Sequence, residues 1–292
     1  MQKNSNIFLS QNINFKKFDS EISDYSLLKL NNMKNVALIT GASSGIGLEF
    51  AHIHAQKGGD LVIVARSEGK LQSLKQKLEG KHGVEVYIIT KDLSQPNAAK
   101  EVFDEVSQAG IGIEYLINNA GFGGHGNFHE RDWVQDEMMI QLNVMALTAL
   151  TRFFLPEMVA RNSGKVLNVS STASLMPGPL QAVYFATKAY VTSFSNAIAC
   201  ELEDTHVTVT ALLPGATETG FAQAAGMEKT DLFKKAFSAR SVAEAGYEGM
   251  LKGKLNVTAG LTFAQKMMMA TIPLSPTKMV MQQVKSMQQA QA

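Results

Sequence analysis

The chain has 292 residues, a formal net charge of +1 and 45% hydrophobic residues, which suits one large globular domain with an ample core. So small a net charge gives no electrostatic footprint for nucleic acid or an anionic membrane. The single cysteine excludes an intrachain disulfide and a cysteine-built metal site, and we expect a reducing, cytoplasmic setting.

The first 32 residues are rich in Asn, Lys and Ser, and they lack the sustained apolar stretch and small-residue cleavage site of a signal peptide. We interpret residues 1–32 as a disordered leader, or as a segment upstream of a natural start at Met33. No apolar run in the chain approaches the roughly eighteen residues of a membrane span, so we expect no integral membrane segment.

Beyond residue 33, short apolar runs alternate with stretches at helical spacing, such as Leu71, Leu74 and Leu78. The apolar runs are 36–40, 61–65, 84–89, 115–117, 166–169 and 207–213. Buried strands that alternate with helices predict a parallel sheet covered on both faces, with right-handed crossovers. We therefore predict one doubly wound α/β domain over residues 33–274, followed by a C-terminal helix and tail over 275–292.

A glycine-rich turn follows the first predicted strand. Residues 40–47 read Thr-Gly-Ala-Ser-Ser-Gly-Ile-Gly, and we expect the next helix to begin at Leu48. Glycines let backbone N–H groups approach a pyrophosphate, and a helix N-terminus favours its negative charge. The spacing differs from G-x-G-x-x-G, and no Lys-Ser or Lys-Thr pair follows as in a Walker loop. The place of the turn, after a strand and before a helix, predicts a nucleotide site.

The end of the second predicted strand indicates which cofactor binds. An acidic residue there usually meets a free ribose 2′-hydroxyl, but here Ala65 is followed by Arg66. A guanidinium suits a 2′-phosphate, so the sequence favours NADP over NAD. Glu68 lies close enough to keep NAD as an alternative, and a solvated loop position is the structural alternative for Arg66.

Two later strand ends carry polar residues. Asp92 could accept a hydrogen bond from an adenine amino group, or it could cap the following helix, as could Ser94. Asn118 and Asn119 can tie neighbouring strand ends together, and Gly121 leaves room for a flat ring. Alone, the segment 118–121 would indicate only a turn.

Tyr184 and Lys188 are four residues apart on a predicted helix and project from one face. A phenol has a reference pKa of ~10, and a fixed ammonium nearby lowers that pKa toward the working range. Ser171 could add a donor to a substrate oxygen held by the tyrosine. Such a trio suits proton transfer to or from a carbonyl or an alcohol; a chance pairing on a surface helix is the alternative.

In their order and spacing, these motifs resemble the short-chain dehydrogenase/reductase family, in its NADP-preferring branch, from Met33 to about Leu274. The resemblance implies a Rossmann-like fold with about seven parallel strands, and a catalytic set of Asn143, Ser171, Tyr184 and Lys188. The residues at the family's cofactor-contact positions are Gly41, Ser43, Ser44, Gly45, Ile46, Gly47, Arg66, Asp92, Leu93, Asn119, Ala120, Gly121, Tyr184, Lys188, Pro214, Gly215, Thr217 and Thr219.

The resemblance also implies the reaction and the assembly. We expect NADP(H)-dependent reduction of a small-molecule ketone or aldehyde, reversible as alcohol oxidation, by a homodimer or homotetramer. A catalytically silent NADP-binding regulator is one alternative, and an epimerase or dehydratase relative is another.

The last third of the chain leaves further alternatives open. We expect a substrate loop over about 218–240, with Phe221, Met227, Leu232 and Phe237, although helix packing explains these residues equally well. Val280, Val284 and Met287 fall at helical spacing, and we expect this helix to pack on its own domain. A lid, a partner-docking helix or a membrane-surface contact are the alternatives. We expect no metal site at His52, His54, His125 or His129, and we expect the last two to be solvated.

Overall fold

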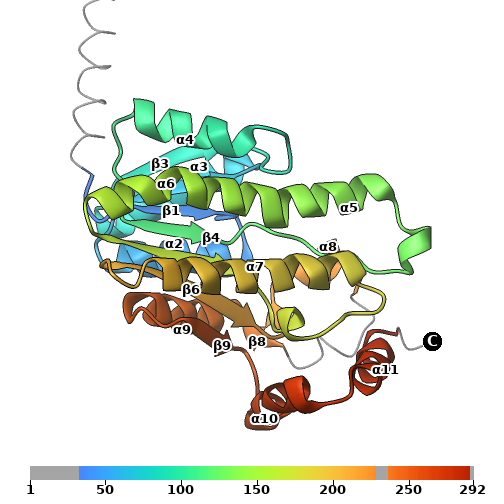
Figure 1. Cartoon of the computed structure of the whole chain (residues 1–292). Coiled ribbons are helices and arrows are strands. Elements are labelled where there is room, and N and C mark those ends of the chain that lie inside the picture. Colours follow the sequence, from blue (N-terminus) through green and yellow to red (C-terminus); the bar gives the residue numbers. More distant parts are fainter. Residues whose placement is uncertain (1–32, 228–235, 290–292) are drawn as a thin grey trace, which may run out of the picture.

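A parallel seven-stranded sheet forms the centre of the computed structural model, which describes residues 33–227 and 236–289 (Figure 1). The strand order is β3-β2-β1-β4-β5-β6-β9, and every pair in this sheet is parallel. The predicted leader over 1–32, Leu232 in the predicted substrate loop and the tail beyond 289 lie outside the described residues.

The strands are β1 (Ala37–Thr40), β2 (Leu61–Ala65), β3 (Val86–Thr90), β4 (Tyr115–Asn118), β5 (Gly164–Val169), β6 (Val207–Pro214), β7 (Thr217–Glu218), β8 (Phe237–Ser238) and β9 (Asn256–Ala259). The α-helices are α2 (Gly45–Gln56), α3 (Glu68–His82), α4 (Ala98–Gln108), α5 (Trp133–Ile140), α6 (Leu147–Ala160), α7 (Ala182–Glu201), α8 (Phe221–Ala224), α9 (Ala239–Leu251), α10 (Phe263–Thr271) and α11 (Thr277–Gln288). A π-helical segment, Gln141–Ala146, joins α5 to α6, and short 3₁₀ segments lie at Phe128–Glu130, Thr172–Leu175 and Ile272–Leu274.

The predicted α/β fold is confirmed, and each of the six apolar runs forms a strand. All residues of β1 and β2 are buried, as expected for central strands of a parallel sheet with both faces covered. The seventh strand, β9, was not among the predicted runs. It lies at the edge of the sheet beside β6, and of its four residues only Ala259 is buried.

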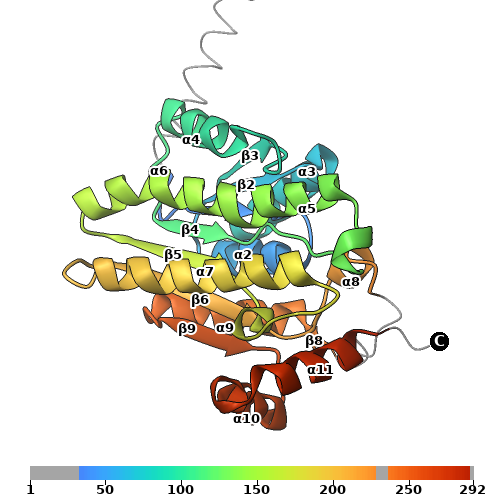
Figure 2. The same ribbon diagram turned by 45° about the vertical axis from the view of Figure 1, so that its right-hand side comes forward.

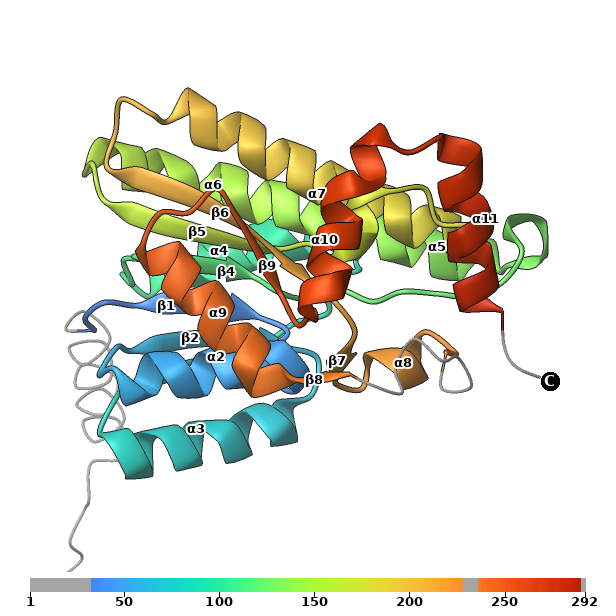
Figure 3. The same cartoon turned by 90° about the horizontal axis from the view of Figure 1, so that it is seen from below.

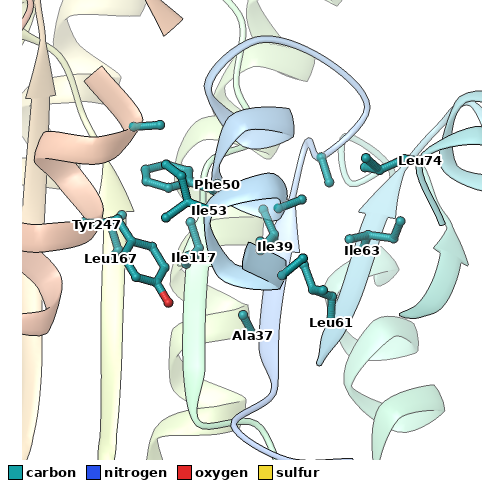
Figure 4. Close-up of a cluster of buried hydrophobic side chains, with 14 of the residues drawn as sticks. Ala37, Ile39, Phe50, Ile53, Leu61, Ile63, Leu74, Ile117, Leu167 and Tyr247 are labelled. Atoms are coloured by element: carbon teal, nitrogen blue, oxygen red, sulfur yellow. The ribbon is translucent and has the colours of Figure 1, made fainter. Parts of the chain in front are cut away.

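Helices cover both faces of the sheet. On one face α2, α3 and α9 bury a core with Phe50, Leu74 and Tyr247 against the strands (Figures 3 and 4). On the other face α4 and α6 contribute Val102 and Phe154 to a second core. The carboxyl ends of β1 and β4 lie side by side where the chain reverses its direction of winding across the sheet. Open α/β sheets bind their ligands at such a switch point.

One long helix in the described part, Trp133–Ala160, is apolar enough to cross a membrane, judged by length and composition only. It contains Gln141 and Asn143 near its middle, so it is not a continuous apolar run. Its inner face, with Leu150 and Phe154, belongs to the second core, and 39% of its most apolar window is buried. It lies beside α7 in Figures 1 and 2.

The C-terminal helices α10 and α11 gather with α8 at one end of the molecule (Figures 1 and 3). The predicted helix around Val280 and Val284 is α11, and both valines are buried in a cluster with Tyr184 and Phe185. The expectation that this helix packs on its own chain is therefore confirmed. The division of the chain at residue 274 stays a prediction.

Candidate active site

The glycine turn lies between the end of β1 and the start of α2. The helix begins at Gly45, three residues before the predicted start at Leu48, so Gly45, Ile46 and Gly47 form its first turn. Because glycine is a poor helix former, the sequence did not indicate that the helix begins at Gly45. The first N–H groups of a helix have no intrahelical partner, and Ser44 at the N-cap makes no capping side-chain bond. The turn therefore presents backbone donors toward the cavity that Gly41, Ser43, Ser44 and Ile46 line.

Asn119 ties the end of β4 to this turn. Its Nδ2 donates to the carbonyl oxygen of Thr40 at 2.9 Å, and the backbone N–H groups of Asn119 and Ala120 both donate to Thr40 Oγ1 at 3.0 Å. Asn118 plays the same part between β4 and β5, because its Nδ2 donates to Asn168 Oδ1 at 2.9 Å. The prediction that these asparagines join neighbouring strand ends is confirmed.

The far end of the cavity is lined by Arg66, Lys70, Lys91 and Asp92. Lys91 is paired with Glu101 at 2.8 Å, whereas no ion pair involves Arg66 or Lys70 within 33–227 and 236–289. Lys70 was not predicted; it lies in the first turn of α3, four residues after Arg66. Glu68, the residue for which NAD was kept as an alternative cofactor, does not line the cavity.

Asp92 does not cap the helix that follows it. Its Oδ1 accepts from the backbone N–H of Ser94 at 3.0 Å and from Ser94 Oγ at 2.7 Å. The N-cap of α4 is Asn97, so the capping interpretation of Asp92 and Ser94 is wrong. The local Asx turn leaves Asp92 and Leu93 on the cavity wall, beside Lys91.

Tyr184, Ser171 and Lys188 meet in the same cavity. Tyr184 and Lys188 come from the first two turns of α7, and both side chains are buried. Ser171 follows β5, where its Oγ accepts from the backbone N–H of Ala173 at 3.1 Å and also bonds to the Tyr184 phenol. Lys188 Nζ donates to the carbonyl oxygen of Val169 at 2.8 Å and lies 5.9 Å from the centre of the Tyr184 ring. The spacing of four residues thus places both groups on one face, as predicted.

The pKa of Tyr184 does not follow the sequence-based expectation. Burial raises the pKa of Tyr184 to about 12, and the hydrogen bond from Ser171 opposes this rise only in part. Burial also lowers the pKa of Lys188 to about 8, because it penalises the ammonium. The lysine bonds to a carbonyl, so desolvation of the phenol outweighs the attraction of the ammonium.

Asn143 lies in the π-helical segment between α5 and α6. Its side-chain amide pairs with Phe122 in both directions, since Nδ2 donates to the Phe122 carbonyl at 2.9 Å and Oδ1 accepts from its N–H at 3.2 Å. A Cβ at Gly121 would come within 2.9 Å of Asn143 Oδ1 and 3.4 Å of Lys188 Nζ. The absence of a side chain at Gly121 therefore lets three elements converge. Single π-turns inside α-helices are frequent at functional sites.

The segment after β6 crosses to the start of α2. The backbone N–H of Gly215 donates to the Ala259 carbonyl at 2.9 Å, and Thr217 Oγ1 donates to the Gly215 carbonyl at 2.9 Å. A Cβ at Gly45 would lie 3.0 Å from the Thr219 methyl group. Pro214, Gly215, Thr217 and Thr219 therefore line the cavity beside the glycine turn. Among the predicted cofactor residues, only Gly47 stays outside the lining.

The remaining wall comes from segments for which the sequence left several interpretations open. The cavity has a volume of about 900 Å³, and residues of α10 and α11 form part of its wall. The loop after β4 also contributes, through Phe122. Apolar helices far along the chain carry no local mark of this role, so only long-range packing reveals it.

His125 differs from the predicted solvated state. Its Nε2 lies 2.9 Å from the carbonyl oxygen of Gln288, so the ring nitrogen donates and ties the loop after β4 to the end of α11. His129 is highly exposed, as expected. In the described ranges no three His, Cys, Asp or Glu side chains are grouped to hold a metal ion.

Comparison with known proteins identifies the family. The sequence profile described as short chain dehydrogenase matches residues 35–230. The chain therefore belongs to the short-chain dehydrogenase/reductase family, as the motifs predicted, and it is an oxidoreductase of that family.

Individual relatives agree with this assignment. The chain is 34% identical over 216 residues to the uncharacterized oxidoreductase YvrD of Bacillus subtilis, which covers 71% of this chain and 81% of YvrD. A solved short-chain dehydrogenase from Sphingobium yanoikuyae, in complex with NADPH, has 32% identity and a TM-score of 0.73 and covers 88% of this chain and 98% of its own. A solved relative from Burkholderia phymatum, in complex with NAD, has 25% identity and a TM-score of 0.73 and covers 85% and 95%. Matches to vertebrate very-long-chain 3-oxoacyl-CoA reductases span less than two thirds of those proteins.

Proposed function

We propose that the chain reduces a ketone or an aldehyde with NADPH and oxidises the corresponding alcohol in reverse. The observation that carries the proposal is the convergence of Tyr184, Ser171 and Lys188 on one cavity with the glycine turn. A hydroxyl pair and a buried amine beside a nucleotide-binding turn suit proton transfer to an oxygen at the reacting carbon.

The residues of the chain supply the proton and the orientation. A carbonyl oxygen held between the hydroxyls of Ser171 and Tyr184 receives the Tyr184 proton as charge develops on it, so an oxyanion does not accumulate. A pKa of about 12 keeps Tyr184 protonated at neutral pH, as a proton donor requires. The nicotinamide, when bound, supplies the hydride. Lys188 and Asn143 would return a proton to Tyr184 through water, with Lys188 next to the phenol.

The chain's residues fit a dinucleotide with a 2′-phosphate. The first turn of α2 offers backbone N–H groups that have no partner within the helix to a pyrophosphate, and Gly121 leaves the space that a flat ring needs. Arg66 and Lys70 line the other end of the cavity, where a 2′-phosphate would lie. Both charges favour a phosphate over a hydroxyl, which supports NADPH as the preferred cofactor.

The decisive experiment replaces Tyr184 by Phe. This variant should bind NADPH nearly as the wild type does, while the turnover number for ketone reduction falls by about 10² or more, the usual effect of a positioned acid. Cofactor oxidation over a panel of ketones and aldehydes measures turnover, and fluorescence titration measures NADPH binding. A Tyr184→Phe enzyme with normal turnover would refute the role of the phenol.

The same panel separates the alternative functions. A wild-type chain that binds NADPH but reduces no ketone or aldehyde would be a silent regulator, and product analysis would reveal an epimerase or dehydratase. We also propose a homodimer or homotetramer, since α6 and its flanking segment expose Met145 and Val159 while α7 exposes Tyr190. Light scattering of the purified protein would test the assembly. Cytoplasmic location stays a prediction.

A further inference from the structure

The cavity has two chemically different ends. Four of its charged lining residues, Arg66, Lys70, Lys91 and Asp92, lie at the end beyond β2 and β3. The fifth, Lys188, donates to the Val169 carbonyl. Every lining residue that α10, α11 and the turn between them contribute is uncharged. A carboxylate buried there would therefore meet no cation among the described residues, and an unpaired buried charge is costly.

Methionine dominates the uncharged end. Seven of the chain's 15 methionines line the cavity, four of them on α10 and α11: Met268, Met269, Met279 and Met287. The thioether side chain is flexible and polarizable, so it adapts to irregular apolar shapes. Val280 and Val284 are buried in a cluster with Tyr184, so this apolar wall is continuous with the buried side chains around the tyrosine. The wall therefore suits a large apolar body next to the carbonyl.

One polar atom interrupts this wall. Gln288 lines the cavity and is only 2% exposed, and its Oε1 has no hydrogen-bond partner among the described residues. Its backbone carbonyl is held by His125 at 2.9 Å, which fixes the last turn of α11. Buried polar atoms are rarely left unpaired because the loss of hydration is costly. An N–H or O–H group on a ligand would supply the missing donor.

The position of Gln288 sets a length for that ligand. Gln288 lies four residues beyond Val284 and eight beyond Val280, so it is roughly 6 to 12 Å farther along the helix axis at ~1.5 Å per residue. Both valines share the cluster of Tyr184. A ligand that contacts both Val280 and Gln288 therefore extends over about 12 Å of the helix axis, which suits a bulky body such as a fused-ring skeleton better than a small aldehyde.

We propose that the substrate is a bulky, uncharged, largely apolar ketone whose far end carries a hydrogen-bond donor that Gln288 Oε1 accepts. This inference rests on the proposed reductase function and names the substrate class of the same site.

The first test ranks three matched fused-ring ketones with the wild-type chain and NADPH. The three differ only at the end far from the carbonyl, which carries a hydroxyl, a hydrogen or a carboxylate. We expect kcat/KM to be about tenfold higher for the hydroxy ketone than for the unsubstituted one, on the usual cost of an unpaired buried group. The carboxylate should be the poorest substrate. Equal or better turnover of the carboxylate would overturn the proposal.

The second test removes the acceptor. Gln288→Leu should lower kcat/KM for the hydroxy ketone about tenfold and leave the unsubstituted ketone unchanged, so the preference disappears. Gln282→Leu is the matched control, because Gln282 is exposed on the same helix and does not line the cavity; it should keep the preference. A Gln288→Leu enzyme that retains the wild-type preference would overturn the role of this residue.

Binding separates this proposal from the reaction itself. The Kd of each ketone for the NADPH-loaded Tyr184→Phe variant should follow the same order as kcat/KM, because the phenol hydroxyl is not part of the far contact. Turnover of small aldehydes without binding of bulky ketones would refute the substrate class and leave the reductase function intact. Ordered binding of the ketones without turnover by the wild type would instead refute the reductase function.

Discussion

Lys188 Nζ lies 5.9 Å from the centre of the Tyr184 ring, and its hydrogen bond goes to the Val169 carbonyl. Because burial lowers the pKa of Lys188 to about 8, the side chain changes charge within the range where the enzyme can be assayed. Tyr184, with a pKa of about 12, stays protonated over that range. The two groups should therefore titrate separately, and we expect Lys188 to set the alkaline limit of activity.

This separation predicts the pH dependence of ketone reduction. Lys188 is an ammonium below its pKa and a neutral amine above it, so kcat/KM should be constant at lower pH and decline as the pH rises through about 8. In the Lys188→Arg variant, the guanidinium at this position stays charged at all accessible pH values. Its activity should be lower, because the guanidinium has a different shape, but the decline near pH 8 should be absent. The same breakpoint in both enzymes would assign it to another group.

Cofactor preference should depend on Arg66 more than on any other side chain at that end of the cavity. Replacing Arg66 by Asp removes a charge-assisted hydrogen bond, worth about 1.5–3 kcal/mol, so the Kd for NADPH should rise roughly tenfold or more. The Kd for NADH should stay the same or fall. Lys77→Gln, an exposed change on α3 away from the cavity, is the control and should alter neither Kd. Equal losses for both cofactors would contradict a phosphate contact.

Gly47 tests the packing that holds the glycine turn against β4. An added Cβ would overlap Asn119 Nδ2 and the Gly41 carbonyl oxygen. Gly47→Ala should therefore lower the free energy of unfolding by about 1–3 kcal/mol and weaken NADPH binding as the turn shifts. Gly80→Ala is the matched control, because its Cβ would meet nothing within 4 Å. Alanine also favours the helical conformation of α3, so the free energy of unfolding should rise by about 0.5–1 kcal/mol. Urea unfolding measures the free energy of unfolding of both variants. A Gly47→Ala protein as stable as the wild type would show that the surrounding atoms can move to accept the added methyl group.

The central strands and the placement of Tyr184 and Lys188 on one helical face could be predicted because both leave local marks. A buried parallel strand needs a continuous apolar run, and two side chains on one helical face need a spacing of four. The strand β9 leaves no such mark, since at the sheet edge Asn256 and Thr258 are exposed. Its pairing with β6 depends on contacts far along the chain.

The rest of the site depends on burial, which the sequence does not state. The predicted fall in the pKa of Tyr184 failed because desolvation of the phenol exceeds the effect of a lysine that bonds elsewhere. The apolar wall of α10 and α11 was open to several interpretations for the same reason. The structure assigns these helices to the cavity, because both line it and Val280 and Val284 share a buried cluster with Tyr184.

His54 provides a test of stability away from the site. Its Nδ1 lies 2.7 Å from the Tyr247 hydroxyl and its Nε2 lies 2.7 Å from the Asn35 carbonyl oxygen. The carbonyl can only accept, so Nε2 carries the hydrogen and Nδ1 accepts from Tyr247. This arrangement uses both nitrogens of the neutral ring, and a proton on Nδ1 would break the bond to Tyr247.

Burial lowers the pKa of His54 below its ordinary value of 6.5, which fixes the sign of the acid effect. As the pH falls below 6.5, the unfolded chain binds a proton that the folded chain does not, so the free energy of unfolding should decrease. The decrease should end once the pH passes below the lowered pKa of the folded state. His54→Gln cannot titrate there, so its unfolding free energy, measured in urea between pH 8 and pH 5, should have a shallower slope. If His54→Gln and wild type lose stability in parallel, the acid sensitivity arises elsewhere.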